Sequence, residues 1–355
     1  MKDGPLDRAD LHGRVQKALD TFLDEHQPRL RGVSEDLDVL LDVLRDLVVG
    51  GKRLRPAFCY WGWRGAGGAD DEAIVTVATS FELLHACAII HDDVMDASDL
   101  RRGRPSVHQQ FASLHRGAGW RGDSAGFGVG AAILLGDLCL AWADEMFTAS
   151  GLPAEALRRA RPAYDDMRTE LMAGQYLDLL EQARGVGSVE SAMRIVRYKS
   201  AKYTVERPLH VGGQLAGAGT AVLDAYSAYG LPLGEAFQLR DDLLGVYGDP
   251  AQTGKPAGDD LREGKRTVLV AMALEQATVA QADVVKRLLG ADDLDDAGVA
   301  ALRQVIADTG AVAAVEARID ELRQSAVGAL RDSSIDVDAH DVLRELAAAA
   351  TARRD

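Results

Sequence analysis

Three acidic residues at the end of an apolar segment could bind a metal ion. Asp92, Asp93 and Asp96 follow the stretch 81–90, which is mostly apolar. On a helix, residues four apart lie on one face, so the carboxylates of Asp92 and Asp96 would be one turn apart. Such carboxylates repel unless a cation lies among them, and oxygen-only ligands suit Mg²⁺ completed by substrate phosphates. A solvated acidic helix end is the alternative, but the apolar stretch favours a metal site at the rim of a buried groove.

A second acidic pair, Asp241 and Asp242, ends another segment with helical spacing. By itself this pair is only moderately specific. Two such helices facing each other would surround one cavity with carboxylates from opposite walls, as helix bundles do when they build multi-metal sites. The combination of the two motifs therefore predicts a cavity that binds several metal ions.

Basic residues lie on both sides of the first acidic motif in the sequence. Arg101 and Arg102 occupy an Arg-rich turn just after it, and guanidinium groups grip phosphate oxygens with a planar fork of donors. Lys52 and Arg55 precede the motif beside Pro56, which suits the first turn of a helix, and helix N-termini attract anions. Isolated lysines, each more often a surface residue when taken alone, stand at Lys199, Lys202, Lys255 and Lys265. Together these cations are numerous enough to receive two diphosphates.

The segments that must position these residues show apolar side chains at helical spacing, and none shows a sustained period of two. The sequence predicts helices at roughly 37–48, 72–97, 128–149, 153–183, 220–247, 266–277 and 310–330. Aromatic residues are only 5% of the chain, whereas Ala and Leu are abundant, which favours helices over sheet. No Gly- or Pro-rich break resembles an interdomain linker. We therefore expect an all-α fold and a single domain over residues 1–355, with C-terminal helices over 280–351.

The net charge of −15 argues against a nucleic-acid partner, because a phosphate backbone is held by a broad basic surface. The negative net charge also does not favour the binding of diphosphate substrates. Any polyanionic substrate must therefore be held by local clusters of Lys and Arg together with bound cations.

The three cysteines, Cys59, Cys87 and Cys139, are far apart and lie in apolar surroundings, which is typical of buried thiols in a reducing compartment. The N-terminus lacks the apolar run of a signal peptide. The richest apolar stretch, 127–143, is interrupted by a Gly-Asp pair and is too short to span a bilayer comfortably. We expect a cytoplasmic protein without a transmembrane segment.

These residues, in this order, resemble the trans-isoprenyl diphosphate synthases, also called polyprenyl synthetases. The resemblance covers roughly residues 30–270, and its most specific part is Asp92-Asp-Val-Met-Asp96 followed by Arg101-Arg102-Gly-Arg-Pro105. The pattern is closest to that of geranylgeranyl diphosphate synthases. The resemblance implies a helical bundle of the isoprenoid synthase type with a central active-site cavity, and a homodimer.

The resemblance also implies roles for individual side chains. Isopentenyl diphosphate would be held by Lys52, Arg55, His85 and Arg102. The allylic diphosphate would be held by Arg101, Lys199, Lys255 and Lys265. Three Mg²⁺ ions would be bound by Asp92, Asp93, Asp96 and Asp241. Along the wall near the reacting carbons would lie Gln238, Gln175 and Asp178, and Ser200 and Gln238 would bind substrate. The catalytic groups would be Lys199, Gln238, Asp92 and Asp96.

The sequence departs from the family pattern at two positions. Gly245 stands where many members have a third Asp in the second acidic motif, which puts in doubt whether that whole motif binds metal. Ser200 stands where Thr is usual beside the lysine, and because Ser keeps the hydroxyl we expect little consequence.

The chemistry that the resemblance implies is ionisation of the allylic diphosphate, condensation with isopentenyl diphosphate, and proton loss. The primer would be dimethylallyl, geranyl or farnesyl diphosphate. Product length would be set on the helix that leads to Asp92, where Ala88 and Cys87 are small and Phe81 is the first aromatic residue reached. From Cys87 to Phe81 is about 9 Å at a helical rise of ~1.5 Å per residue, which leaves room for a product of about twenty carbons.

Two other functions are compatible with parts of this pattern. A terpene cyclase of related fold shares the first acidic motif, but would carry an Asn/Ser/Glu metal triad where this chain has Asp241 and Asp242. A non-catalytic subunit of a heteromeric synthase would typically lose the first motif, which is whole here. Turnover by the purified chain alone separates these alternatives.

Overall fold

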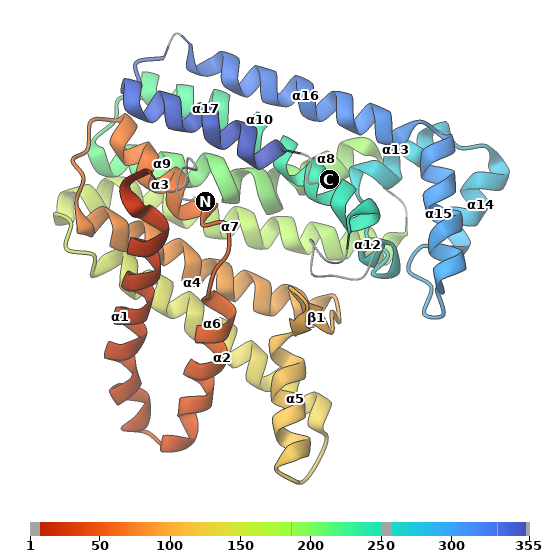
Figure 1. The fold of residues 1–355 in the computed structure, drawn as a ribbon, viewed down its shortest axis with the longest axis horizontal. Helices are drawn as coiled ribbons and strands as arrows, with labels where there is room; N and C mark the ends of the chain where they lie inside the picture. The colour runs from red at the N-terminus through yellow and green to blue at the C-terminus, as the bar shows by residue number, and fades with distance from the viewer. Residues whose placement is uncertain (1–7, 186, 250–257, 332, 353–355) are drawn as a thin grey trace.

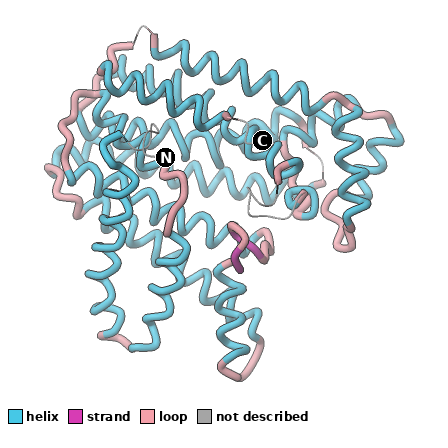
Figure 2. Tube along the Cα trace, in the orientation of Figure 1, coloured by secondary structure: helices cyan, strands magenta, loops and turns pink. Residues whose placement is uncertain are grey.

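The computed structural model describes residues 8–185, 187–249, 258–331 and 333–352. Helices make up most of this part of the chain, and its only strands form one short hairpin (Figure 2). The hairpin pairs β1 (Leu100–Arg101) with β2 (Arg104–Pro105) in antiparallel register, with Arg101 opposite Arg104. The all-α prediction is confirmed.

The helices are as follows. Up to residue 184 they are η1 (Arg8–Asp10), α1 (Leu11–Arg31), η2 (Glu35–Leu37), α2 (Asp38–Val48), α3 (Leu54–Gly65), α4 (Glu72–Met95), α5 (Val107–Gly117), α6 (Ser124–Thr148) and α7 (Ala154–Arg184). After residue 188 they are α8 (Val189–Ile195), the π-helix η3 (Val196–Glu206), α9 (Arg207–Ala216), α10 (Thr220–Tyr247), α12 (Asp259–Arg262), α13 (Val268–Gln276), α14 (Val279–Leu288), α15 (Asp296–Asp308), α16 (Ala311–Leu330) and α17 (Val337–Thr351). The seven predicted helical segments correspond to α2, α4, α6, α7, α10, α13 and α16.

These helices bury two hydrophobic cores, and α10 and α16 contribute to both. The first core contains the apolar faces of α1 to α7, α9 and α17, with Phe81 and Tyr229 among its fully buried side chains. The second core lies among α8, α13, α14, α15 and the later part of α10, with Leu239 and Leu269 at its centre. In Figure 1 the long helix α16 runs along the top and links the first core to α14 and α15 at the right-hand end.

The π-helix η3 packs between α7 and α10, and two glycines permit this close approach. A β-carbon at Gly174 of α7 would lie 2.4 Å from the backbone nitrogen of Lys199. A β-carbon at Gly234 of α10 would lie 2.5 Å from the α-carbon of Ala201. Any larger residue at either glycine would push η3 away from its neighbours. Because π-helical turns are rare and frequently mark functional sites, the position of Lys199 on this π-helix supports a functional role for it.

Two helices, α4 and α6, are long and apolar enough to cross a membrane, as judged by length and composition in the described residues. The apolar part of α4 is 72% buried inside the protein, whereas that of α6 is only 28% buried. The stretch 127–143 was expected to be too short to span a bilayer. This expectation was wrong, because the helix α6 that contains it extends further at both ends and has 25 residues. Phe127, Ile133 and Leu134 on α6 are exposed.

Candidate active site

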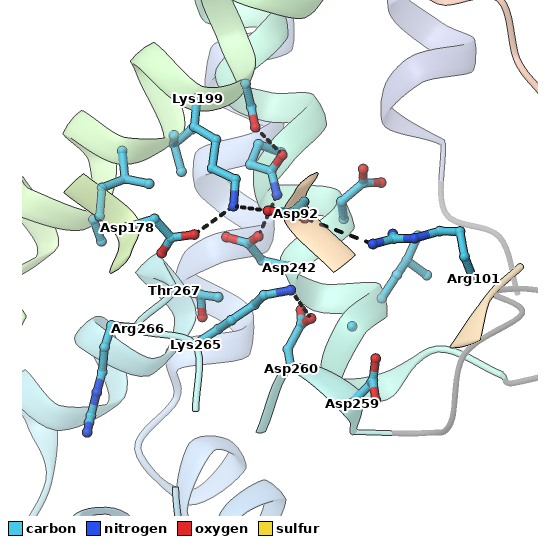
Figure 3. A pocket seen from close by; sticks show the side chains of 18 of the residues that line it. Asp92, Arg101, Asp178, Lys199, Asp242, Asp259, Asp260, Lys265, Arg266 and Thr267 are labelled. Atoms are coloured by element: carbon cyan, nitrogen blue, oxygen red, sulfur yellow. Dashed lines mark hydrogen bonds and ion pairs between the residues drawn. The ribbon is translucent and has the colours of Figure 1, made fainter. Parts of the chain in front are cut away.

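A cavity of about 560 Å³ opens between η3, α10, α12 and the end of α4 (Figure 3). Of the residues predicted to form the site, its lining includes Lys52, Asp92, Arg101, Arg102, Lys199, Ser200, Gln238, Asp241 and Lys265. These residues come from distant parts of the sequence, so the fold brings the two acidic motifs and most of the basic residues to one place. Lys255 lies outside the described residues.

Asp92 and Lys199 form the centre of the site. The Lys199 ammonium lies 3.2 Å from Asp92 Oδ1 and donates a 2.7 Å hydrogen bond to Asp178 Oδ2, as Figure 3 shows. Burial acts to raise the pKa of Asp92, but Lys199, Lys265 and Arg101 outweigh it and hold this pKa below its ordinary value. Burial alone would lower the pKa of Lys199, but the carboxylates of Asp92 and Asp178 raise it above its ordinary value. Both groups are therefore charged at neutral pH.

Asp93 is directed toward Arg101 and is not among the residues that line the cavity. The Arg101 Nε donates a 2.9 Å hydrogen bond to Asp93 Oδ1, and the side chain of Asp93 is only 1% exposed. A second guanidinium nitrogen of Arg101 contacts the same oxygen and lies 3.9 Å from Asp92 Oδ2. This placement supports a role for Asp93 in orienting Arg101. Its role as a metal ligand stays a prediction.

Asp96 lies one turn beyond Asp92, and its side chain is only 2% exposed. Neither of its carboxylate oxygens forms a hydrogen bond within the described residues, although Lys265 Nζ lies 3.4 Å from Oδ2. Burial and the neighbouring charge of Asp92 raise the pKa of Asp96 to about 6. Lys265 also pairs with Asp260 at 3.4 Å and Glu263 at 2.5 Å, so one ammonium group is shared by three carboxylates.

The opposite wall is built by α10. Ser200 Oγ donates a 2.5 Å hydrogen bond to Gln238 Oε1, and Gln238 Nε2 donates one of 2.8 Å to Asp242 Oδ1. This chain fixes the orientation of the Gln238 amide. Burial raises the pKa of Asp242 to about 8, and the carboxylates of Asp260 and Asp241 add to the shift.

The donor set fits Mg²⁺. No group of three or more His, Cys, Asp or Glu side chains within the described residues is arranged to hold a metal by itself. Lys199 pairs with Asp92, and Lys265 pairs with Asp96. However, the two buried oxygens of Asp96 lack hydrogen bonds. Asp92 of α4 and Asp241 of α10 line one cavity from opposite walls. Hard oxygen ligands of this kind, completed by a diphosphate, are what Mg²⁺ prefers. Asp92 and Asp241, which line the cavity, are placed to hold it, and Asp96 lies one turn beyond Asp92, outside the lining.

A second group of cations lies on the α3 side of the site. Arg55 donates a 3.0 Å hydrogen bond to Thr204 Oγ1 and stacks over the ring of Tyr203, whose hydroxyl is 3.4 Å from His85 Nδ1. Burial and the nearby arginines hold the pKa of His85 well below its ordinary value, so the ring is neutral. Burial also lowers the pKa of Arg102, as do the surrounding arginines. Like charges held this close together form a site for a polyanion.

A buried ion pair that was not predicted from the sequence supports this basic group. Arg53, between the two predicted ligands Lys52 and Arg55, pairs with Glu82 of α4 and donates a hydrogen bond to the Val48 carbonyl. Its backbone is left-handed (φ 49°), as is that of Arg102 (φ 53°). Such strain costs of order 1 kcal/mol per residue and is concentrated at ligand sites.

Lys202, one of the isolated lysines, does not belong to the site. It donates a 2.7 Å hydrogen bond to Glu170 of α7 and lies near Glu206. Asp259 and Asp260, in contrast, line the cavity and were not predicted. The acidic run after Gly258 was the signal in the sequence that could have identified them.

Comparison with known proteins identifies the family of this chain. The profile of the polyprenyl synthetase family matches residues 37–306. A geranylfarnesyl diphosphate synthase from Aeropyrum pernix is 35% identical over 274 residues, covering 76% of this chain and 79% of that protein. The crystal structure of geranylgeranyl pyrophosphate synthase from Corynebacterium glutamicum, complexed with isoprenyl diphosphate and magnesium, superposes with a TM-score of 0.93 at 42% identity. That comparison covers 96% of this chain and 98% of the other.

The fold and the paired acidic walls therefore define an all-α enzyme of the isoprenoid synthase type. The chain belongs to the polyprenyl synthetase family and is a trans-prenyltransferase.

Proposed function

We propose that this enzyme uses Mg²⁺ to join isopentenyl diphosphate to an allylic diphosphate and releases geranylgeranyl diphosphate, an all-trans product of twenty carbons. The observation that carries the proposal is the presence of two separate groups of cations at one acid-lined cavity. Lys199, Lys265 and Arg101 lie among the acids, whereas Arg55 and Arg102 lie on the α3 side. Two diphosphates can therefore be held at once.

Each group of cations then has a distinct task. Lys199, Lys265 and Arg101 bind the allylic diphosphate and stabilise the negative charge that develops when its carbon–oxygen bond breaks. Bound Mg²⁺ supplies further neutralisation of that charge. Lys52, Arg55, His85 and Arg102 hold isopentenyl diphosphate, whose double-bond electrons form the new carbon–carbon bond. The proton lost from the condensed product passes to the departing diphosphate, so no protein nucleophile is needed.

The product-length proposal rests on α4. Phe81 is fully buried and meets the ring of Tyr164 edge-on at 5.9 Å, while Tyr164 stacks on Phe147 at 4.4 Å. Phe81 lies six residues before Cys87 on α4, so we propose that these three packed rings block the tail of the product beyond Cys87. The relatives named above as synthases of geranylgeranyl and geranylfarnesyl diphosphate support a product of twenty to twenty-five carbons.

The proposal extends to assembly and location. The exposed apolar residues of α6, with Met172 and Tyr176 of α7, support a homodimer in which a second copy covers them. The three buried free cysteines support a reducing, cytoplasmic location. Size-exclusion chromatography with light scattering tests the first proposal, and cell fractionation tests the second.

Turnover by the purified chain tests the proposed function. The chain is incubated with Mg²⁺, isopentenyl diphosphate and dimethylallyl, geranyl or farnesyl diphosphate in turn, and products are identified by mass spectrometry. We expect geranylgeranyl diphosphate from each primer and none after chelation of Mg²⁺. A hydrocarbon formed without isopentenyl diphosphate would indicate a cyclase. Absence of turnover by a folded chain would indicate a non-catalytic subunit.

A further inference from the structure

The π-helix η3 has one side toward the active-site cavity and another side toward charged residues of α7. Lys199 and Ser200 line the cavity, and Lys199 Nζ pairs with Asp178, as Figure 3 shows. Lys202, three residues after Lys199 on the same helix, is instead directed toward Glu170 of α7. A contact that fixes the second side of η3 therefore also fixes where its first side lies.

Glu170 joins α7 to this second side of η3 and to the start of α9. Its Oε1 accepts a 2.7 Å hydrogen bond from Lys202 Nζ, and Arg207, the first residue of α9, donates one hydrogen bond of 2.7 Å to each of its two oxygens. The exposed fractions of the Arg207, Lys202 and Glu170 side chains are only 16%, 17% and 18%. Burial alone would raise the pKa of Glu170, but Arg207 and Lys202 outweigh it and hold this pKa below its ordinary value. Glu170 is therefore an ionised, mostly buried carboxylate that binds two cations.

Two other acids and a histidine lie near these two cations at longer range. The carboxylate of Asp166 is 3.8 Å from Arg207, and its side chain is 62% exposed. The carboxylate of Glu206 is 3.8 Å from Lys202, and its Oε2 has no hydrogen-bond partner among the described residues. Burial lowers the pKa of His210, so its ring is neutral at neutral pH. The α7 carboxylate, at 2.7 Å from both cations, holds them more directly than any of these groups.

The helix type of η3 makes such contacts from neighbouring helices important. π-helical segments are mostly single turns, whereas η3 has 11 residues. Its later half packs closely on α10, since a β-carbon at Gly230 would lie 2.9 Å from the α-carbon of Glu206. Near its start, Arg197 pairs with Glu235 of α10 at 2.8 Å. Ion pairs thus tie η3 to α10 through Arg197 and to α7 through Lys202.

We propose that Glu170, through Lys202 and Arg207, fixes the position of η3 and thereby places Lys199 and Ser200 at the allylic diphosphate. This inference rests on the proposed function, because Lys199 is one of the cations assigned to that diphosphate. Glu170 does not line the cavity, so it is a positioning residue that acts through the backbone of η3. The inference also gives a role to Lys202, the lysine that lies outside the site.

The variant Glu170→Gln tests this role because it removes the charge and keeps the size of the side chain. Lys202 and Arg207 lose their shared partner, and mostly buried cations without a partner are unfavourable. Because displaced catalytic groups lower the rate steeply, we expect kcat/KM for the allylic diphosphate to fall about tenfold. The KM of isopentenyl diphosphate should not change, since its proposed ligands do not lie on η3. Steady-state kinetics, measured well below the melting temperature, gives both constants. Unchanged kinetics in folded Glu170→Gln would overturn the inference.

The matched control is Glu145→Gln, the same change at an acid that joins α6 to α1. Glu145 accepts a 2.8 Å hydrogen bond from Arg29 and lies 3.2 Å from His26 Nε2, so it too has two partners. We expect a lower melting temperature in both variants and altered kinetics only in Glu170→Gln. An equal loss of kcat/KM in both variants would show a general effect of lost stability, and the inference would then be wrong.

Hydrogen exchange followed by mass spectrometry measures η3 directly. Peptides from 196–206 should exchange faster in Glu170→Gln than in the wild-type chain, whereas peptides from α16 should not change. Lys202→Arg keeps the cation and should retain wild-type exchange and kinetics, and Lys202→Met should behave like Glu170→Gln. This pair decides the inference even if Glu170→Gln does not fold. Lys202→Met that cannot be distinguished from Lys202→Arg would refute it.

The two proposals fail in different ways. If the wild-type chain turns over and Glu170→Gln has the same kinetics, only this inference fails. Faster exchange of η3 without any change in kinetics would also overturn it, because η3 would then move without consequence for Lys199. If the folded wild-type chain does not turn over at all, the proposed function fails, and this inference fails with it.

Discussion

The two acidic walls of the cavity are built on different cores and carry their charge differently. On α4, rooted in the first core, each aspartate has a cation partner, namely Lys199 for Asp92, Arg101 for Asp93 and Lys265 for Asp96. On α10 and α12, rooted in the second core, Asp242 accepts a hydrogen bond from an amide, and Asp260 shares one lysine with other acids.

The pKa values show the consequence of this difference. Three cations lower the pKa of Asp92 against the effect of burial, whereas burial raises that of Asp242 to about 8. Asp92 on α4 is therefore ionised before substrate arrives. Asp242 on α10 gains its charge only when a cation compensates for burial, so we expect α4 to dominate metal binding.

Removal of Asp92 should have the largest effect on activity. Asp92→Ala removes a carboxylate that pairs with Lys199 and that we propose binds metal, so we expect turnover to fall at least ~10³-fold, or about 4 kcal/mol. The melting temperature should change little, because the side chain faces the cavity. Steady-state kinetics at saturating Mg²⁺ measures the first effect. Near wild-type turnover would remove Asp92 from the metal site.

The two aspartates of α10, Asp241 and Asp242, provide the next comparison of turnover. Asp241→Ala should reduce turnover by roughly 10²–10³-fold, slightly less than Asp92→Ala. Asp242→Ala should reduce it less, because Asp242 is buried beneath Gln238 and its main contact orients that amide. The turnover numbers of the two variants, measured together, check this order. A larger loss in Asp242→Ala would mean that the second wall binds metal through Asp242.

Several features of the site could be predicted from local sequence, and others depend on tertiary structure. Asp92 and Asp96 follow an uninterrupted helical pattern, so their shared face was predictable. The π-helix η3 was missed because its wider turns do not follow the α-helical period. Helix α3 was also not predicted, because it is buried on almost all sides and its sequence therefore lacks an amphipathic pattern. The contact of Glu170 with Lys202, and that of Arg53 with Glu82, join separate elements, and no local pattern encodes them.

The basic residues should separate the two substrates. Arg101 lies against the acids of α4, whereas Arg102 lies among the arginines of the α3 side. We expect Arg101→Ala to raise the KM of the allylic diphosphate about tenfold and Arg102→Ala to raise that of isopentenyl diphosphate by a similar factor. Separate titration of each substrate measures both constants. Equal effects of both variants on both substrates would show that the cations form one undivided site.

Substitutions on α4 before the aspartates should have the smallest effect on turnover and the clearest effect on product length. Cys87 is small and buried, with its sulfur 3.8 Å from His91 Nδ1. Cys87→Phe should shorten the main product to fifteen carbons while turnover with dimethylallyl diphosphate falls only a few-fold, because the acidic motif begins more than one helical turn further along α4 and is untouched. Mass spectrometry of the products measures this shift.

Phe81→Ala is the opposing variant, and it should lengthen the product. It also removes a fully buried ring, at a cost of about 3–5 kcal/mol in the free energy of unfolding, so its products must be measured well below its melting temperature. Cys87→Ser, which barely changes volume, is the control. An unchanged product distribution in both Cys87→Phe and Phe81→Ala would place the obstacle on another helix. Because α6 packs along α4 and contributes Phe147 to the same aromatic cluster, it would be the next helix to test.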